Sequence, residues 1–421
     1  MKYDVIIIGA GAAGLMAMKE LVEAGRTVCI LEAAAIAGGR IVTLHRDDLE
    51  EIVEAGAEFI HGDLPLTLQL LNEARISYTK VVGEMISVEK GIWQNDEMHD
   101  SHWAQFTEQL KKSGEDITIR SFLEKYFGSS EFTGLRRAVQ NFAEGFDLAD
   151  ISKASVLAIK KEWRHENEHQ YRVDGGYGRL VNYLEDICKR AGGVFQFNAP
   201  VTKIEHNKNH VTVHIANGDT YSASKIIITV SAGVLQSGAI KFEPKLTLYD
   251  HAVQQIGFGS VIKFLLYFKT NFWKDHPGSI GFLLSDEEIP TWWTQLPHEN
   301  NLLTGWLGGP PAVTKSGDSD EMLLSSALLS LSRIFHLPLQ SLSNNLLFHK
   351  IICWHNDPYT KGAYSYSTLG SAEARKILLK PVDDTIYFAG EALYEGDLQG
   401  TVEAALQSGR SVARTIRAIS G

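Results

Sequence analysis

The sequence predicts an α/β protein, in which a discontinuous Rossmann-like domain is combined with an α+β domain that carries a mixed sheet. Three observations support this fold class: a buried strand with spaced glycines at the start, further strands in the middle and at the end, and aromatic-rich elements between them. The chain has 421 residues, of which 44% are hydrophobic, so it can bury a large core in two or three domain-sized units.

The chain begins with a strand followed by regularly spaced glycines. Residues 5–8 are a β-branched run, which is typical of a buried parallel strand. Gly9 allows a tight turn, Gly11 lets the backbone approach a pyrophosphate, and Gly14 lets the next helix pack close to the strand. A helix over 15–24 then directs its N-terminal amide groups and the positive end of its dipole at the phosphates. This arrangement predicts a dinucleotide site.

An acidic residue ends the second expected strand, which covers 27–31. Glu32 lies roughly 20 residues beyond the glycines, where a ribose diol needs a hydrogen-bond acceptor. Gly38-Gly39-Arg40 follows, a flexible turn with a guanidinium that can neutralise pyrophosphate oxygens. The alternative for this turn is an ordinary glycine turn with a surface arginine. The glycine pattern alone does not separate NAD from FAD.

With these residues the sequence resembles the flavin-containing amine oxidase superfamily, which includes monoamine, polyamine and spermine oxidases and flavin histone demethylases. The resemblance returns along nearly the whole chain and is most like the polyamine and spermine oxidase branch. It implies an FAD-binding domain built from several segments, a substrate-binding domain and an amine substrate.

Two motifs near the end of the chain extend the resemblance. In the family, the turn Phe388-Ala389-Gly390-Glu391 and the helix start at 400–405 lie along the ribityl chain and the pyrimidine edge of the flavin. A helix N-terminus there supplies amide donors and positive potential, which stabilise the anionic reduced flavin. The alternatives are a helix-cap or surface role for Glu391 and an ordinary N-terminal helix position for Thr401.

A further motif, 54–62, contains small residues followed by a histidine. Gly56 and Ala57 are small enough for backbone to lie against an isoalloxazine ring. Ile60-His61-Gly62 resembles the polyamine and spermine oxidase branch, in which a histidine here faces the active site. A neutral imidazole can accept a hydrogen bond from a substrate amine, or help keep the amine deprotonated. A purely structural histidine is the alternative.

Lys263 lies in the middle of the apolar run 257–268. Burying an ammonium costs free energy unless the group is paired or neutralised, so this break in the pattern indicates a functional site. In the family, a lysine at the matching position holds a water against flavin N5 and assists reoxidation by oxygen. Strand alternation leaves the alternative that Lys263 points to solvent.

Aromatic residues late in the chain resemble the aromatic wall of the family's active site. Tyr364 matches one of the two tyrosines that enclose the substrate in monoamine oxidases, whereas the other position is Thr401. Aromatic faces attract cations and position amines. Core packing is the alternative for Tyr364 and Trp354. Monoamine oxidases attach their flavin through a cysteine beside this tyrosine; that position is Ala363 here, which predicts non-covalent FAD.

The predicted site residues form two groups. The residues expected to be catalytic are Lys263, His61, Tyr364 and Thr401. The residues expected to bind the cofactor are Gly9, Gly11, Ala13, Gly14, Glu32, Ala33, Gly39, Arg40, Gly56, Ala57, Glu58, Val201, Trp354, Gly390, Glu391, Thr401 and Val402.

Other polar residues carry weaker signals, and no metal site is predicted. His165 and His169 have metal-ligand spacing, but their acidic surroundings and the lack of further ligands favour solvated side chains. Glu144 and Asp147 are weak candidates for binding a distal ammonium, with helix-end charge as the alternative. Neither a disulfide framework nor a metal cluster is implied by three widely spaced cysteines in apolar surroundings, Cys29, Cys188 and Cys353.

The net charge and the hydropathy of the sequence indicate which kinds of molecule the protein can bind. The formal net charge is −11, from 51 acidic and 40 basic residues, which disfavours nucleic acid and mildly favours cationic ligands, although ordinary solubility explains it equally well. The sequence shows neither a signal peptide nor an apolar run of about 18 residues. We therefore expect a cytoplasmic monomer or homodimer that binds an amine and O2 but no nucleic acid or membrane.

The order of the expected elements predicts two domains that are each made of several segments. Residues 1–75, 171–244 and 371–421 are predicted to form the FAD-binding domain, and 76–170 and 245–370 the substrate-binding domain. Helices are expected at 102–112, 118–127, 134–142, 179–191, 320–335 and 400–419. Strands are expected at 194–197, 201–206, 211–215, 225–230, 261–268, 280–284, 302–307 and 386–388.

Together these observations predict an FAD-dependent amine oxidase that acts on a primary or secondary amine, a polyamine above all. A neutral amine would transfer a hydride from its α-carbon to flavin N5 and become an imine, and oxygen would reoxidise the flavin to give hydrogen peroxide. Three alternatives stay open: an amino-acid oxidase, a desaturase or porphyrinogen oxidase of the same fold, and a non-catalytic flavoprotein. A histone demethylase role is disfavoured by the acidic charge and the lack of additional recognition domains.

Overall fold

Two compact units make up the computed structural model, which describes residues 2–46, 51–94, 102–163, 169–276 and 278–419. Unit 1 comprises Met1–Tyr78, Arg172–Phe258 and Asp357–Gly421, and unit 2 comprises Thr79–Tyr171 and Gly259–Asn356. The chain thus passes between the units four times. The predicted ranges differ mainly around the last substrate segment, which was expected over 245–370.

That segment is shorter because both of its predicted ends belong to unit 1. Helix α9 (Thr247–Val253) contributes Ala252 and Val253 to the core of the unit 1 sheet. The short strands β15 (Gly257–Phe258) and β21 (Ser365–Tyr366) pair with each other antiparallel. Tyr364, which was expected in the substrate-binding segment, therefore lies in unit 1.

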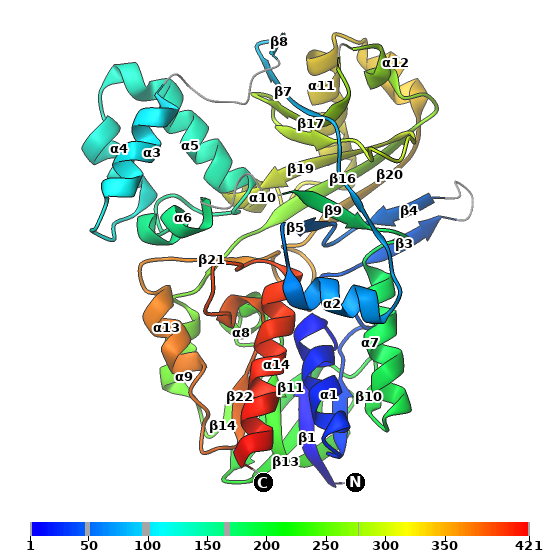
Figure 1. Cartoon of the computed structure of the whole chain (residues 1–421), viewed down its shortest axis with the longest axis vertical. Coiled ribbons are helices and arrows are strands. Elements are labelled where there is room, and N and C mark those ends of the chain that lie inside the picture. The colour runs from blue at the N-terminus through cyan, green and yellow to red at the C-terminus, as the bar shows by residue number, and fades with distance from the viewer. Residues whose placement is uncertain (1, 47–50, 95–101, 164–168, 277, 420–421) are drawn as a thin grey trace. The chain divides into compact units, whose positions relative to one another are not determined.

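Unit 1 is built on an eight-stranded sheet with β1 (Lys2–Ile8) near its centre (Figure 1). β1 pairs in parallel with β2 (Val28–Leu31) on one side and with β13 (Thr220–Ile228) on the other. The remaining strands of this sheet are β10 (Val194–Gln196), β11 (Val201–Asn207), β12 (His210–Ile215), β14 (Lys241–Glu243) and β22 (Ile386–Phe388). β22 pairs with β13, so the end of the chain completes the sheet begun by its first residues.

Further elements complete unit 1. Its helices are α1 (Ala12–Glu23), α2 (Pro65–Glu73), α7 (Gly178–Arg190), α8 (Ala232–Gln236), α13 (Ser371–Leu378), the short 3-10 helix η4 (Glu391–Leu393) and α14 (Val402–Ile419). Strands β3 (Thr43–Arg46) and β4 (Glu51–Glu54) form a hairpin-like pair, and β5 (Phe59–His61) follows. Strands β6 (Tyr78–Lys80) and β9 (Gln170–Val173) carry the chain between the units.

The first and last helices of unit 1 pack directly on each other, as Figure 1 shows for α1 and α14. A Cβ added to Gly409 of α14 would lie 2.1 Å from the carbonyl oxygen of Ala13, so only glycine permits this approach. On the other side of α1, a Cβ added to Gly14 would lie 2.0 Å from the carbonyl oxygen of Gly9. The N-terminus of α1 is therefore held between the β1 turn and α14.

Unit 2 contains a seven-stranded mixed sheet and two groups of helices. The strands, in spatial order, are β20 (Leu346–Cys353), β16 (Val261–Phe268), β19 (Leu302–Gly308), β18 (Thr291–Trp293), β17 (Ile280–Ser285), β7 (Glu84–Glu89) and β8 (Ile92–Gln94). β17 and β7 pair in parallel and the other neighbours pair antiparallel.

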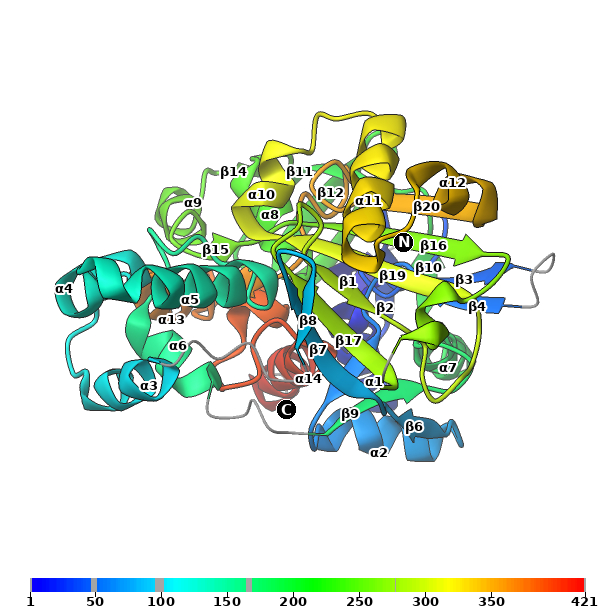
Figure 2. The ribbon, with the colours of Figure 1, turned by 90° about the horizontal axis from the view of Figure 1, so that it is seen from above.

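One helix group covers a face of this sheet and the other is packed around aromatic side chains. Helix α11 (Asp320–Phe335) shares a core with β16 and β19, to which α10 (Gly309–Thr314), η3 (Phe272–Asp275) and α12 (Leu339–Asn345) also contribute buried residues. The second group contains α3 (Trp103–Lys112), α4 (Ile119–Phe127), η1 (Ser130–Phe132), α5 (Thr133–Gly145) and α6 (Val156–Glu162). Figure 2 shows α3 to α6 gathered together. Among their side chains, the Trp103 and Trp163 rings stack, and the Phe106 ring contacts both at a tilt.

No single helix in the described ranges is long and apolar enough to cross a membrane. The pair α11 and α12, bent by 116° at the break between them, passes the test of length and composition only when the two are taken together.

The glycine contact between α1 and α14 can be tested with Gly409→Ala. Alanine normally favours a helix by about 1 kcal/mol over glycine. The added methyl group meets a carbonyl oxygen here, and overpacking typically costs about 1–3 kcal/mol. We therefore expect a lower free energy of unfolding, measured by denaturant titration.

Ser411→Ala is the matched control, because Ser411 lies exposed on the same helix. It should leave the free energy of unfolding within about 0.5 kcal/mol of the unchanged protein. A Gly409→Ala variant as stable as the unchanged protein would contradict the packing argument.

Candidate cofactor and active site

The turn after β1 leaves backbone amides at the N-terminus of α1 available for a ligand. Gly9 has φ +103°, a conformation that favours glycine, and Gly11 occupies the N-cap position of α1 without a side-chain cap. The turn is tied to the next glycine pair, because the Gly38 amide donates to the Ala10 carbonyl at 3.0 Å. Uncapped amides and the positive helix end suit an anion such as a pyrophosphate.

Glu32 stands at the end of β2 with its carboxylate held in place. It is 7% exposed, and its two oxygens accept hydrogen bonds from the Ala10 amide at 2.6 Å and the Ala34 amide at 2.8 Å. Burial raises the pKa of Glu32, and the hydrogen bonds from backbone amides oppose this shift. The carboxylate is thus fixed beside the glycine turn, as a ribose-binding residue requires.

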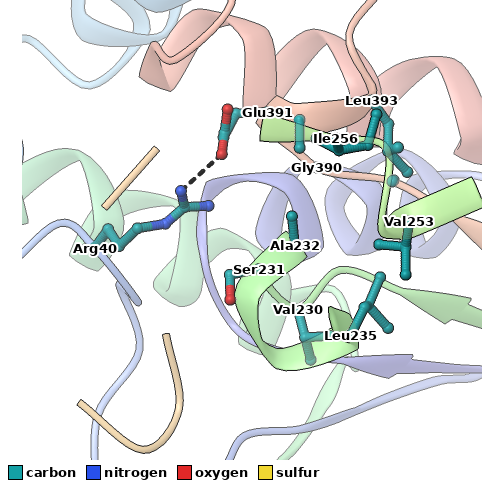
Figure 3. Close-up of a pocket in the computed structure, with 12 residues that line it drawn as sticks. Arg40, Val230, Ser231, Ala232, Leu235, Val253, Ile256, Gly390, Glu391 and Leu393 are labelled. Carbon is teal, nitrogen blue, oxygen red and sulfur yellow. Dashed lines mark hydrogen bonds and ion pairs between the residues drawn. The ribbon is translucent and has the colours of Figure 1, made fainter. Parts of the chain in front are cut away.

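An ion pair joins the beginning of unit 1 to its end. Arg40 Nη1 lies 2.8 Å from Glu391 Oε1 (Figure 3). The same Nη1 also donates to the Ala363 carbonyl at 2.6 Å. The second carboxylate oxygen of Glu391 accepts from the Ser365 hydroxyl at 2.7 Å. Glu391 therefore fixes both the guanidinium and the segment that contains Tyr364.

A small pocket opens beside this ion pair, lined by Arg40, Gly390, Glu391 and apolar residues from α8, α9 and η4. Gly390 has φ +149°, and an added Cβ there would meet no atom within 4 Å. A dinucleotide such as FAD needs uncapped amides, a fixed carboxylate, a guanidinium and glycine backbone that no side chain covers. The residues present in unit 1 therefore fit this cofactor.

The motif 54–62 lies against the backbone of Arg40. The Ala57 amide donates to the Arg40 carbonyl at 3.0 Å, and a Cβ on Gly56 would lie only 2.0 Å from that oxygen. Glu58 is buried and paired with Arg172 Nε at 3.0 Å. Glu58 thus has a structural partner, while its predicted contact with the cofactor stays a prediction.

His61 ends β5 and is partly buried. Burial lowers its pKa from 6.5 to about 4. The imidazole is therefore neutral at physiological pH, which is the protonation state that the sequence analysis required for interaction with a substrate amine.

The hydroxyl of Thr401 forms hydrogen bonds with backbone groups at the start of α14. It donates to the Leu398 carbonyl at 2.7 Å and accepts from the Ala404 amide at 3.1 Å, as a helix cap does. Beside it, Gly400 has φ +75°, and a Cβ there would lie 3.1 Å from Tyr364 Cδ2. The Tyr364 ring and the Thr401 backbone are thus neighbours in unit 1, and Val402 begins α14 next to them.

A carboxylate that the sequence analysis missed fixes the same helix. Glu403 is fully buried and accepts hydrogen bonds from the Leu66 amide, the Thr67 amide and the Thr67 hydroxyl at 3.1, 2.7 and 2.7 Å. These donors form the first turn of α2, four residues after His61. In the sequence, Glu403 looks like an acid in the first turn of an exposed helix, and only the position of α2 reveals its role.

Lys263 belongs to unit 2 and does not point to solvent, since it is 1% exposed. Its Nζ lies 5.5 Å from the centre of the Trp293 ring, and Trp306 is its cross-strand partner on β19. Trp293 and Trp306 contact each other with ring centres 5.7 Å apart. This face of the unit 2 sheet therefore combines one ammonium with an aromatic surface.

The other predicted residues are distributed over both units. Val201 begins β11 in unit 1, whereas Trp354 is buried in unit 2 and donates its amide to the Val261 carbonyl at 3.1 Å. Asp147 accepts a hydrogen bond from Trp163 Nε1 at 2.9 Å, and burial raises the pKa of Glu144.

Metal binding has little support among the residues that the structure describes. They contain no group of three or more histidine, cysteine or acidic side chains that could hold an ion. His169 lies 3.4 Å from Lys80 Nζ, and His165 falls outside the described residues.

Comparison with known proteins identifies related families. The profile described as flavin containing amine oxidoreductase matches residues 12–417. Polyamine oxidase 2 of Arabidopsis thaliana is 26% identical, over 98% of this chain and 88% of its own. Lysine-specific histone demethylase 2 of Homo sapiens is 28% identical over 99% of this chain, and homolog 3 of demethylase 1 of Arabidopsis thaliana is 26% identical over 98%. This chain spans only 53% and 30% of those two demethylases.

Solved structures share the fold. A triple mutant of putrescine oxidase superposes with a TM-score of 0.84 at 21% identity, over 99% of both chains. Cyclohexylamine oxidase from Brevibacterium oxydans superposes with a TM-score of 0.82 at 22% identity, over 100% of both chains. These similarities confirm the predicted fold class.

The lowered pKa of His61 predicts acid sensitivity. In the unfolded chain this histidine takes up a proton near pH 6.5, whereas in the folded protein it stays neutral down to about pH 4. Acid therefore favours the unfolded state in this range, and the stability contributed by the neutral ring is lost as pH falls from 6.5 toward 4. The free energy of unfolding should fall less between pH 7.5 and pH 5 in His61→Asn than in the unchanged protein.

His298→Asn is the control for this measurement, because His298 is exposed and should not change the pH dependence. Equal pH dependence in His61→Asn and the unchanged protein would show that His61 titrates normally.

Proposed function

Because the chain belongs to the family of flavin-containing amine oxidoreductases, we propose that it is an FAD-dependent oxidase of amines, with a polyamine as the favoured substrate class. The proposal rests on one observation: unit 1 brings together polar groups from the two ends of the sequence. The glycine turn, Glu32 and Arg40 come from the first 40 residues, and Glu391 and the α14 start come from the last 40. Oxygen is the proposed electron acceptor.

The proposed cofactor is non-covalent FAD. Gly9, Gly11 and the N-terminal amides of α1 would hold its pyrophosphate, and Glu32 would accept from a ribose hydroxyl. Ala363 offers no thiol for a covalent link. When bound, FAD supplies the redox chemistry: it takes the hydride that leaves the amine α-carbon and passes two electrons to O2, which yields an imine and hydrogen peroxide.

The protein's own residues would bind and orient the neutral amine. Neutral His61 can accept a hydrogen bond from an N–H of that amine, which leaves the nitrogen lone pair available to form the imine. The Tyr364 ring beside Gly400 would orient the amine. Lys263 is proposed to hold the water that assists reoxidation by oxygen, since it is a buried cation in an apolar strand.

One finding changes the role proposed for Thr401. Its hydroxyl proton is donated to the Leu398 carbonyl, and its oxygen accepts from the Ala404 amide. We therefore assign it a role in shape rather than in proton transfer: the small side chain leaves open the side of the substrate space that a second tyrosine would fill.

The first test compares substrate classes. The purified yellow protein is assayed for hydrogen peroxide with spermine, spermidine, an acetylated polyamine, benzylamine, a monomethyl-lysine peptide and L-amino acids. We expect turnover with polyamines to exceed turnover with the other compounds by at least about tenfold in kcat/KM, since a missing polar partner commonly costs that much. Turnover confined to amino acids would refute the proposal and favour the amino-acid oxidase alternative.

The second test concerns Lys263. In Lys263→Met, the rate of flavin reoxidation by O2 should fall by about 10-fold or more, as expected for loss of a positioned electrostatic group. The anaerobic rate of flavin reduction by the amine should change much less. Both rates are measured by stopped-flow absorbance.

Lys350→Met provides the control for the second test, because Lys350 is an exposed lysine on the neighbouring strand β20. It should leave both rates unchanged. Unchanged reoxidation in Lys263→Met would remove Lys263 from the role proposed for it.

A further inference from the structure

A buried arginine in α13 contacts three separate segments of unit 1. Arg375 is 6% exposed. Its Nε donates to the Ala392 carbonyl at 2.9 Å, its Nη1 and Nη2 both donate to the Ser367 hydroxyl at 3.2 Å, and its Nη2 donates to Gln399 Oε1 at 2.9 Å. One guanidinium therefore connects the Ser367 side chain with the Ala392 backbone and the Gln399 side chain, both of which come later in the chain.

Each of these stretches carries a residue of the proposed site. Ala392 directly follows Glu391, Ser367 lies three residues after Tyr364, and Gln399 lies two residues before Thr401. Ser367 also donates its hydroxyl proton to Gln399 Oε1 at 2.8 Å, so these two stretches are joined directly as well. The guanidinium thus contacts residues that lie one to three positions from Glu391, Tyr364 and Thr401, which belong to the proposed site.

The planar guanidinium imposes a fixed relation between its acceptors. Its N–H groups point along set directions in one plane, whereas a lysine ammonium has no such fork. Removing a guanidinium from water costs free energy, and its hydrogen bonds to three oxygens offset this cost only while those oxygens keep their positions. Arg375 therefore resists a shift of Ser367 relative to Gln399.

The relation between these two segments decides where the Tyr364 ring lies. An added Cβ on Gly400 would be 3.1 Å from Tyr364 Cδ2 and 3.8 Å from the Ser365 carbonyl oxygen. The ring thus rests on the backbone between Gln399 and Thr401. If Ser367 moved away from Gln399, this contact would open.

We infer that Arg375 is a positioning residue of the amine-binding wall: by tying Ser367 to Gln399, it holds the Tyr364 ring against Gly400. The inference rests on the proposed function, in which Tyr364 contacts the amine. Arg375 itself acts through Tyr364 and needs no contact with substrate.

Arg375→Met tests the inference, because methionine keeps much of the length and removes every donor. We expect the KM for the best amine to rise about 10-fold while kcat changes less than about threefold, as expected when binding is weakened about equally in the ground state and the transition state. Arg375→Lys should recover only part of this loss. Arg333→Met, which removes an exposed arginine paired with Glu287 in unit 2, should change neither constant.

A double-mutant cycle separates positioning from a general structural role. In a Tyr364→Leu background, Arg375→Met should raise KM by less than about threefold, because the ring that it positions is absent. The same factor in both backgrounds would overturn the inference.

A readout without activity keeps this inference separate from the proposed function. In Arg375→Met, backbone amides of 363–367 and 397–400 should exchange hydrogen faster, while those of β1 stay unchanged. If the protein oxidises no amine, the proposed function fails, and the exchange data still decide the positioning. Unchanged exchange in both segments would overturn the inference.

If Arg375→Met does not fold, Ser367→Ala is used for the same three measurements. This variant removes the acceptor that two guanidinium nitrogens share and leaves the arginine in place.

Discussion

The close approach of backbone to backbone around α1 is the constraint on which unit 1 depends. Gly14 lets the helix lie against the Gly9 carbonyl, and Gly409 lets α14 lie against the Ala13 carbonyl. The N-terminus of α1 cannot move away from either neighbour without losing packed surface. Its uncapped amides are therefore already ordered for the proposed cofactor, which would reduce the entropy cost of binding.

Buried carboxylates that accept hydrogen bonds from amide, hydroxyl or guanidinium groups also hold segments of unit 1 together. Glu32 accepts from two amides, Glu403 accepts from the first turn of α2, and Glu391 accepts from Arg40 and Ser365. A buried carboxylate without donors would cost several kcal/mol, so each of these groups fixes the segments that supply its donors. These three carboxylates thus stabilise contacts between segments that are remote in the chain.

The sequence was sufficient wherever the signal was local. The helix predicted over 320–335 matches α11, and the strand predicted over 261–268 matches β16, because their apolar patterns and flanking residues are contained in a few turns. The glycine turn and Glu32, on which the proposed cofactor site rests, are local signals of the same kind. Strands at sheet edges, such as β8 and β20, were not predicted, since their pairing depends on partners far away in sequence.

The site was less predictable where burial and partners depend on long-range packing. Arg375 and Glu403 look like ordinary helix-surface charges in the sequence, yet both are buried and both bridge remote segments. Tyr364 was expected in the substrate-binding segment 245–370 and lies in unit 1, because the pairing of β15 with β21 joins residues more than 100 positions apart. Thr401 was expected to be catalytic, with an ordinary N-terminal helix position as the alternative, and the geometry of the α14 start shows that its hydroxyl caps the helix.

The pairing of β22 with β13 and the Arg40–Glu391 ion pair also bear on how the protein is made. Synthesis on the ribosome delivers the glycine turn, Glu32 and Arg40 first, whereas Glu391 follows Arg40 by 351 positions, together with β22 and α14. Until those residues leave the ribosome, β13 has an unpaired neighbouring position and α1 lacks the helix that packs on it. From the synthesis of β13 until β22 is made, the nascent chain would expose that sheet edge, which favours aggregation unless the edge is protected. The proposed cofactor site is therefore complete only once Glu391 and the start of α14 have been made.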